Sequence, residues 1–120
     1  MIKAYRLYTG PDGHSHVVSG HIINHEIAAT GSIHFEESPP NSSLDWHTAP
    51  TTQYVITLAG VLEFVTHGGE SFTIVPGNVL IAMDTTGSGH KWRLTNDEPW
   101  RRAYVTFDES VKLSFEAEGQ

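Results

Sequence analysis

Short runs of alternating apolar and polar residues, separated by turns rich in glycine and proline, make up most of this chain. In residues 2–8 the two kinds of side chain roughly alternate, and the cluster Thr9-Gly10-Pro11-Asp12-Gly13 then turns the chain. A period of two is typical of strands that bury one face in a sheet. No segment shows the longer period of an amphipathic helix. Turns recur about every eight to twelve residues, which predicts an all-β sandwich or barrel.

The same pattern sets the expected element boundaries. We expect strands at residues 2–8, 14–23, 27–37, 53–58, 61–66, 70–75, 79–83, 91–94 and 100–107, and a loop at residues 38–43. The tail, residues 108–120, is ambiguous because Val111, Leu113 and Phe115 alternate, whereas residues 116–120 are polar and are expected to fray. An antiparallel double-sheet jelly-roll barrel would bury both sheets at this length and limit their free edges.

Length and composition favour a single folded domain. The 120 residues fit one domain, residues 1–120, with a core at about residues 11–107 and a peripheral N-terminal strand and C-terminal tail. Fourteen acidic residues against seven basic ones give a net charge of −7, so nucleic acid and anionic membranes are not expected partners. There is no cysteine and no apolar run long enough for a signal peptide or a membrane span, so we expect a cytoplasmic protein.

Two histidines in similar settings are the candidate chemical site. Alternation places Gln53, Val55 and Thr57 on one face of a strand, and places His90 on one face of another strand with Trp92. If both faces point inward, the cavity holds His47, Gln53 and His90, with Trp92 as an apolar wall. Imidazole binds Zn, Fe, Ni or Cu. The alternative is a pair of buried histidines hydrogen bonded to polar neighbours.

The spacing around these residues resembles the two sequence motifs of the cupin superfamily, and more narrowly a group of small single-domain bacterial cupins. Gln53 and Gly60 have the spacing of that family's glutamate and glycine, and Gly87 and His90 match its Gly-x-x-His. Asp45 and His47 occupy the positions of the His-x-His pair. The chain departs from the motif at four positions, which carry Asp45, Gln53, Thr85 and Leu94 in place of the usual histidine, glutamate, proline and asparagine.

The resemblance implies a jelly-roll fold, a homodimer and a bound divalent ion (Fe, Ni, Mn or Zn) held by His47, Gln53 and His90. It further implies a metal-dependent enzyme of the dioxygenase, isomerase or lyase type, acting on a small oxygen-bearing organic molecule. One alternative is a non-catalytic cupin module that binds a small molecule with little or no metal. Another is a metal-independent isomerase that uses a histidine as its base.

Several side chains have two readings. Asp45 pointing inward would complete a set of two histidines and one carboxylate, as in non-haem iron oxygenases, whereas Asp45 pointing outward would cap the turn before Trp46. His16 would fold over the barrel mouth as part of the substrate pocket, beside Val55, Thr57 and Trp92, or remain in a solvated segment. The sequence leaves His34 open between the pocket and solvent.

Overall fold

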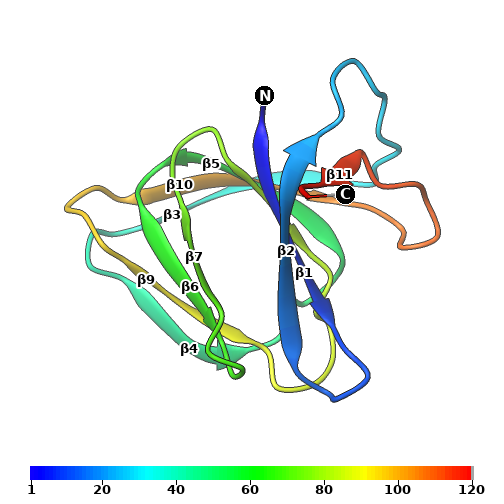
Figure 1. Ribbon diagram of the computed structural model, residues 1–120. Helices are drawn as coiled ribbons and strands as arrows, with labels where there is room; N and C mark the ends of the chain where they lie inside the picture. Colours follow the sequence, from blue (N-terminus) through cyan, green and yellow to red (C-terminus); the bar gives the residue numbers. More distant parts are fainter. Residues whose placement is uncertain (120) are drawn as a thin grey trace.

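The computed structural model describes residues 1–119, which form strands and turns without a helix (Figure 1). The strands are β1 (Lys3–Thr9), β2 (Ser15–Ile22), β3 (Ile33–Ser38), β4 (Ser43–His47), β5 (Gln53–Ala59), β6 (Leu62–Thr66), β7 (Ser71–Ile74), β8 (Val79–Ala82), β9 (His90–Leu94), β10 (Trp100–Thr106) and β11 (Phe115–Ala117). Within this part of the chain there is therefore no helix that could cross a membrane.

Two sheets pack against each other, as the alternation predicts. The larger has seven strands in the order β11-β2-β1-β8-β5-β10-β3, and the smaller has four in the order β4-β9-β6-β7 (Figure 1). The all-β double-sheet architecture is confirmed, with two corrections. The sheets do not close into a barrel, and β1 pairs with β8 in the parallel direction, since the chain crosses between the sheets before β8 returns to β1.

The centre of the large sheet is buried on both faces. Its inner face packs on the small sheet around Leu7, Phe64 and Ile74. Its outer face carries a second apolar cluster around Tyr54 and Ile81, covered by the irregular segment at residues 23–32 and by the C-terminal tail. Strands buried on both faces lose the polar alternation. This explains why all four residues of β8 are apolar and buried.

The two chain ends belong to this sheet, contrary to expectation. β1 lies between β2 and β8, and Ala4 and Leu7 are fully buried, so the N-terminal strand is central rather than peripheral. Residues 115–117, most of them expected to fray, pair with β2 as strand β11, because backbone hydrogen bonds to an open sheet edge do not require apolar side chains. Gln120, the end of that predicted tail, lies outside the described residues.

Two other expectations about the strands were wrong, one about where β3 begins and one about the existence of β4. The strand expected at residues 27–37 begins only at Ile33, and the β-branched residues before it lie in an irregular segment where Ile27 is almost fully exposed. Strand β4 was not predicted because it is short and carries an irregularity between Leu44 and His47, where the register with β9 shifts. A bulge of this kind removes the regular alternation on which the prediction depends.

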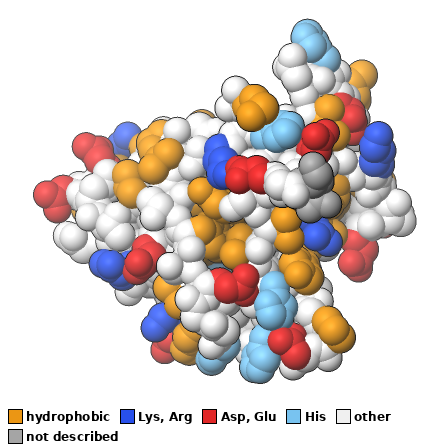
Figure 2. Space-filling model, viewed as in Figure 1, with side chains coloured by type: hydrophobic (Ala, Val, Ile, Leu, Met, Phe, Trp, Pro, Cys, Tyr) orange, Lys and Arg blue, Asp and Glu red, His pale blue; other side chains and the backbone are white. Residues whose placement is uncertain are grey.

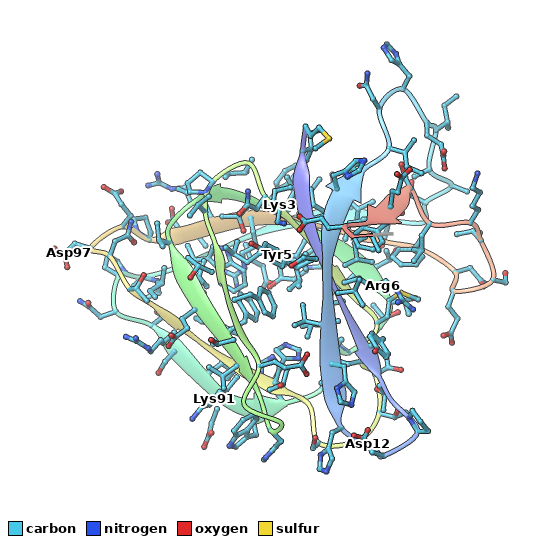
Figure 3. The ribbon with its side chains drawn as sticks, viewed as in Figure 1. Lys3, Tyr5, Arg6, Asp12, Lys91 and Asp97 are labelled. Atoms are coloured by element: carbon cyan, nitrogen blue, oxygen red, sulfur yellow. The ribbon has the colours of Figure 1, made fainter. Side chains whose placement is uncertain are left out.

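Charged side chains are spread over the visible face of the molecule rather than gathered by sign (Figure 2). Side chains cover the outer surfaces of both sheets, and Asp12 marks the turn between β1 and β2 at one end of the molecule (Figure 3). At the surface, the ion pair Arg93–Glu63 joins the neighbouring strands β9 and β6, and Lys3 of β1 pairs with Glu118, just after β11. Exposed pairs of this kind contribute little stability, about 0–1 kcal/mol each.

Candidate functional site

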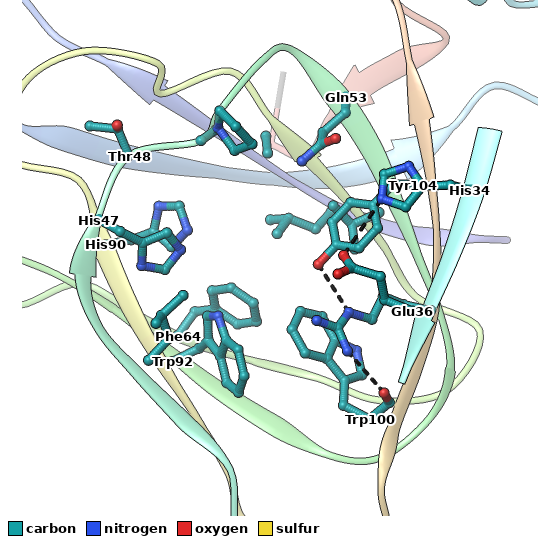
Figure 4. Close-up of a pocket in the computed structure, with 17 residues that line it drawn as sticks. His34, Glu36, His47, Thr48, Gln53, Phe64, His90, Trp92, Trp100 and Tyr104 are labelled. Atoms are coloured by element: carbon teal, nitrogen blue, oxygen red, sulfur yellow. Dashed lines mark hydrogen bonds and ion pairs between the residues drawn. The ribbon is translucent and has the colours of Figure 1, made fainter. Parts of the chain in front are cut away.

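A cavity of about 440 Å³ lies between the two sheets (Figure 4). This volume is in the range of about 300–1,000 Å³ that is usual for small-molecule sites. Its apolar lining includes Leu44, Val55, Phe64, Leu80, Trp92 and Trp100. Its polar lining includes His34, Glu36, His47, Thr48, Gln53, His90, Arg102 and Tyr104. The polar groups gather on two walls, one on each sheet.

The first wall, which we call the histidine wall, is formed by His47 of β4 and His90 of β9. The two residues are directly paired across the small sheet. Their ring centroids are 4.4 Å apart, with the ring planes inclined by 60°. Figure 4 shows the two rings together on one side of the cavity. The structure thus brings together the two histidines that the sequence singled out from segments far apart in the chain.

Glycines allow this close approach. Gly89 has a φ of +75°, and a Cβ there would lie 2.1 Å from the carbonyl oxygen of His47. Gly87 has a φ of +80°, and a Cβ there would lie 2.3 Å from the carbonyl oxygen of Gly13. Both the left-handed backbone and the contact exclude a side chain. The glycines before His90 therefore fix where the strand begins and how near it comes to His47.

Each histidine has one ring nitrogen engaged by the protein. Nδ1 of His90 lies 2.6 Å from Oδ2 of Asp84, and Nδ1 of His47 lies 2.8 Å from the carbonyl oxygen of Asp45. A carbonyl oxygen and a carboxylate only accept hydrogen bonds, so Nδ1 carries the proton in both rings. In the neutral form of either ring the lone pair is then on Nε2, the nitrogen that remains for a ligand.

Asp84 is the anchor behind His90. Its side chain is 0% exposed, and its Oδ2 also accepts a 2.6 Å hydrogen bond from the hydroxyl of Ser15. Oδ1 is buried and has no hydrogen-bond partner among residues 1–119. Because Ser15 donates to the aspartate rather than to a histidine, these three residues are not a Ser-His-Asp nucleophile relay. Their arrangement holds the ring of His90.

Burial shapes the protonation of His47. Desolvation lowers its pKa, while the hydrogen bond to the carbonyl of Asp45 acts in the opposite direction. The lowered pKa keeps the ring neutral at pH 7. A neutral imidazole with its Nδ1 proton committed to the backbone is suited to donate the Nε2 lone pair to a metal ion.

The second wall, which we call the arginine wall, is formed by Arg102 and Tyr104 of β10. Arg102 is 6% exposed, and its guanidinium carbon lies 3.9 Å from the ring centroid of Trp100. Its Nε donates to the hydroxyl of Tyr104 at 2.9 Å. The ring of His34 stacks on that of Tyr104 at 4.9 Å, and His34 lies 3.6 Å from Glu36 at the partly exposed rim. Unlike the histidine wall, this wall offers N–H and O–H donors.

This chain is similar to several solved structures at low sequence identity. The cupin domain of Cnp3 from Schizosaccharomyces pombe matches with a TM-score of 0.53 at 14% identity, over 80% of this chain and 74% of that one. A protein from Neisseria meningitidis matches with a TM-score of 0.48 at 16% identity, over 74% and 82% of the two chains. The cupin domain of an XRE-family transcriptional regulator from Enterobacter cloacae gives 0.36 at 18%, over 90% and 99%.

The match to the Cnp3 cupin domain assigns the fold. This is a small cupin-fold protein. No family model and no curated protein matches its sequence. The fold resemblance predicted from the spacing around His47 and His90 is therefore confirmed, whereas the likeness carries no activity to this chain.

The donor set of this cupin-fold protein fits a metal only in part. His47 and His90 offer two adjacent imidazoles whose Nδ1 atoms are held by a carbonyl and a carboxylate, the usual second layer around a metal-bound histidine. Gln53 also lines the cavity and offers an amide oxygen. Among residues 1–119, however, no cluster of three His, Cys, Asp or Glu side chains is placed to hold an ion. Any ion would rely on the two histidines, Gln53, and water or ligand.

Asp45 is placed outside the cavity. Its side chain is exposed, its Oδ1 accepts a hydrogen bond from the backbone N–H of Trp46, and it lines a groove on the outer face of the small sheet. In a regular strand, Asp45 and His47 would point to the same face. The shifted register between Leu44 and His47 breaks that relation. The two-histidine, one-carboxylate set is therefore not assembled from this aspartate.

Some of the residues predicted to form the pocket line the cavity, and others do not. Val55 and Trp92 line the cavity, and so does His34, whose position the sequence left open. Thr57 points to the same face but is buried behind Trp100, whose Nε1 donates to its hydroxyl at 3.2 Å. His16 does not line the cavity. It is held at the end of the molecule by Asp12 and Glu70.

Sequence reasoning missed Asp84, Arg102 and Tyr104. One signal for the last two was present, because alternation along residues 100–107 puts Trp100, Arg102 and Tyr104 on the same face. Two aromatic residues on the inner face of a strand would have placed the arginine between them inside the protein. No comparable signal exists for Asp84, because its contacts with Ser15 and His90 depend on how three segments meet.

Proposed function

We propose that this cupin is a divalent-metal-dependent enzyme that acts on a small oxygen-bearing organic molecule in the cavity between its sheets, as a dioxygenase, an isomerase or a lyase. The observation that carries the proposal is the histidine wall. His47 and His90 adjoin each other there, and each has its Nδ1 proton committed to the protein and its Nε2 left for a ligand.

The donors indicate which ions are expected. Imidazole nitrogen with an amide oxygen suits Fe, Ni, Mn or Zn, and the absence of a carboxylate in the donor set predicts moderate rather than very tight binding. When bound, such an ion would supply Lewis-acid polarisation of an oxygen atom on the substrate. Asp84 would orient His90 and raise its basicity through the Nδ1 hydrogen bond.

The rest of the cavity would select and shield the substrate. Phe64, Trp92 and Val55 form an apolar surface beside the histidines, which favours a compact organic molecule over a highly hydrated one. Gln53 either completes the metal site or hydrogen bonds the substrate. The aromatic contacts of Trp92 with Trp100, 4.7 Å between centroids, hold these walls in place without a ligand.

Metal analysis tests the proposal. Protein stripped with a chelator is titrated with Fe²⁺, Ni²⁺, Mn²⁺ and Zn²⁺ by calorimetry, and the bound metal is counted by elemental analysis after gel filtration. We expect one ion per chain for at least one metal. We also expect its loss in His47→Ala and its retention in His67→Ala, which alters an exposed histidine stacked on Trp46. Trace binding of all four metals, unchanged by His47→Ala, would contradict the proposal.

The alternative function is a non-catalytic module that binds a small molecule. The two-histidine donor set favours it, since residues 1–119 bring no third His, Cys, Asp or Glu to the pair. The two functions differ in their dependence on metal. A binding module would take up its ligand equally well with a chelator present and would release it unchanged, whereas the enzyme would convert the ligand only when metal is restored. Product analysis by NMR with and without chelator separates them.

We also propose that the protein is a homodimer. The outer strand β3 has one unpaired edge, and its apolar side chains Ile33 and Phe35 are 58% and 67% exposed. An edge of this kind favours pairing with another chain. Light scattering coupled to gel filtration measures the mass directly, and a Phe35→Lys variant should shift it toward the monomer. An unshifted dimer mass would place the interface elsewhere.

A further inference from the structure

Arg102 is buried and has no acidic partner among residues 1–119. The exposed arginines Arg93 and Arg101 form ion pairs with Glu63 and Glu37, as is usual at a protein surface. No carboxylate of residues 1–119 forms an ion pair with Arg102, although its side chain is only 6% exposed and lines the cavity. A buried charge is costly unless it is paired. The arrangement therefore favours an anion from outside the chain.

The hydrogen bonds of the guanidinium show which donors are free. Nε donates to the hydroxyl of Tyr104 at 2.9 Å. Nη1 donates to the hydroxyl of Ser38 at 2.8 Å and to the carbonyl oxygen of Trp100 at 3.1 Å. Arginine has five N–H donors, so the two on Nη2 have no acceptor among the described residues. Nη2 is also not among the fully buried side-chain atoms that lack a hydrogen-bond partner, so it is not completely enclosed by protein atoms. Three fixed donors hold the guanidinium rigid, and the remaining two are available.

Tyr104 offers a further donor beside Nη2. Its hydroxyl oxygen accepts from Nε of Arg102, so its own proton is free to be donated to a ligand. Burial raises the pKa of this phenol, with Arg102 acting in the opposite direction, so the hydroxyl stays protonated at pH 7. Nε and Nη2 lie on one edge of the planar guanidinium. The free phenol proton and the free Nη2 protons can therefore converge on one ligand group.

We propose that Arg102 and Tyr104 bind the carboxylate of the ligand, so that this cupin takes a small organic acid. This rests on the proposed function, which makes the cavity the ligand site. Trp100 and Trp92 line the space beside Arg102 and would contact the body of the acid, while its other end lies toward the histidine wall. One guanidinium matches the single charge of a carboxylate. A phosphate dianion would require a second cation, and no lysine lines the cavity.

Glu36 shapes the affinity of this site. It lies opposite Arg102 in the register of β3 and β10, yet it is half exposed and pairs with His34 at the rim. Its negative charge also acts on the hydroxyl of Tyr104. A bound carboxylate would be repelled by Glu36, so removing that charge in Glu36→Gln should strengthen carboxylate binding. If the charge of Glu36 instead compensated that of Arg102 in the free protein, Glu36→Gln would lower the stability of the protein without strengthening carboxylate binding.

The test uses matched pairs of acids and amides on protein kept free of metal by a chelator. Acetate and acetamide, benzoate and benzamide, and phenylacetate and phenylacetamide are titrated by tryptophan fluorescence and by NMR of the arginine side-chain N–H signals. Trp100 contacts the guanidinium, so binding there should change its emission. We expect saturable binding of at least one carboxylate, much weaker binding of its neutral amide, and weaker binding of inorganic phosphate.

Variants locate the binding at Arg102. Replacing Arg102 with Leu should weaken carboxylate binding by about 10- to 100-fold, the usual worth of hydrogen bonds to a charged group. The control Arg101→Leu alters the adjacent surface arginine and should leave binding unchanged. Arg102→Lys keeps the charge but loses the fork and should give an intermediate affinity. Tyr104→Phe should weaken binding less than Arg102→Leu. Circular dichroism and thermal melts confirm that each variant is folded.

The inference would be overturned by equal binding of acids and amides, by unchanged carboxylate binding in a folded Arg102→Leu protein, or by tighter binding of phosphate than of every carboxylate. Absence of saturable carboxylate binding in the whole panel would overturn it as well. None of them bears on the metal titration, which is performed without carboxylate. Metal binding without carboxylate binding would refute only this inference, and the reverse would refute only the metal-dependent enzyme.

Discussion

The two polar walls of the cavity offer opposite chemistry. On the small sheet, the protein occupies the Nδ1 protons of His47 and His90 and leaves the lone pairs on Nε2. On the large sheet, Nε of Arg102 donates a hydrogen bond to the hydroxyl of Tyr104, and the protons on Nη2 and on the phenol remain free. One wall therefore donates electron pairs and suits a cation, whereas the other donates protons and suits an anion. Aromatic side chains, among them Phe64, separate the two.

This difference shows how a small cavity can orient a ligand. A molecule with a carboxylate at one end and a second oxygen function at the other can satisfy both walls at once. A uniformly polar cavity would bind the same groups in several orientations. Few polar groups at fixed places in an apolar pocket are the usual basis of specificity in small-molecule sites.

The largest effects on ligand binding are expected from two variants, each of which removes a ligand-binding side chain from one wall. We expect His90→Ala to lower metal affinity by more than about 100-fold, because it removes a ligand rather than a supporting group, while carboxylate binding in chelator is retained. Arg102→Leu should do the reverse. Calorimetry of both ligands on both variants gives the comparison. If either variant loses both ligands while still folded, the two walls do not act independently.

The support of the histidine wall is the next effect in size. Asp84→Asn keeps the shape of the side chain but removes the charge that holds Nδ1 of His90, and it should lower metal affinity by about 10- to 100-fold. Asp97→Asn, in the exposed segment after β9 and so beyond the opposite end of that strand from His90, is the control and should leave metal affinity unchanged. Carboxylate binding at the arginine wall should survive both. Undiminished metal affinity in Asp84→Asn would show that the buried pair is purely structural.

The close approach behind the histidine wall can be tested with a glycine pair. Gly89→Ala should destabilise the protein by more than about 1 kcal/mol, because Ala at positive φ is strained and its Cβ would meet the carbonyl of His47. Gly69 also has a positive φ, +84°, but nothing lies near its Cβ position. Gly69→Ala therefore measures backbone strain alone. Urea midpoints compare the two, and equal losses would mean that the contact with His47 carries no weight.

The smallest effect concerns a histidine outside both walls. The hydrogen bond to Asp12, with Glu70 in a lesser role, raises the pKa of His16, in contrast to the lowered pKa of His47. A raised pKa in the folded state gives stability that is full below the unfolded value, about 6.5, and is lost as pH rises through the folded value.

His16→Gln should accordingly lower the urea midpoint slightly near about pH 5.5 and have little effect near about pH 8.5, on either side of the ordinary histidine pKa. Wild type measured at both values supplies the reference, and His21→Gln, a histidine without a carboxylate partner among the described ion pairs, is the control. A larger loss at the higher pH would reverse the assigned sign.

Much of the fold follows from local pattern. Alternation in residues 53–58 and 100–107 gave strands β5 and β10 almost to the residue, since one face of each strand is buried and the turns beside them contain glycine or proline. Strands were missed where the local pattern of side chains does not reflect their environment in the fold. β4 is interrupted by a bulge, and β11 is polar because an edge strand is stabilised mainly through its backbone.

The sequence by itself determined the all-β architecture, because alternation and turn residues are local properties of the chain, and it singled out His47 and His90 as candidate site residues. Only the tertiary structure decided that Asp45 faces outward, that Asp84 holds His90, and that Arg102 is buried with no ion-pair partner among the described carboxylates. Each of these depends on the register between strands and on which segments meet across the fold. A shift of one residue reverses the face to which a strand side chain points, and nothing local in the sequence records that shift.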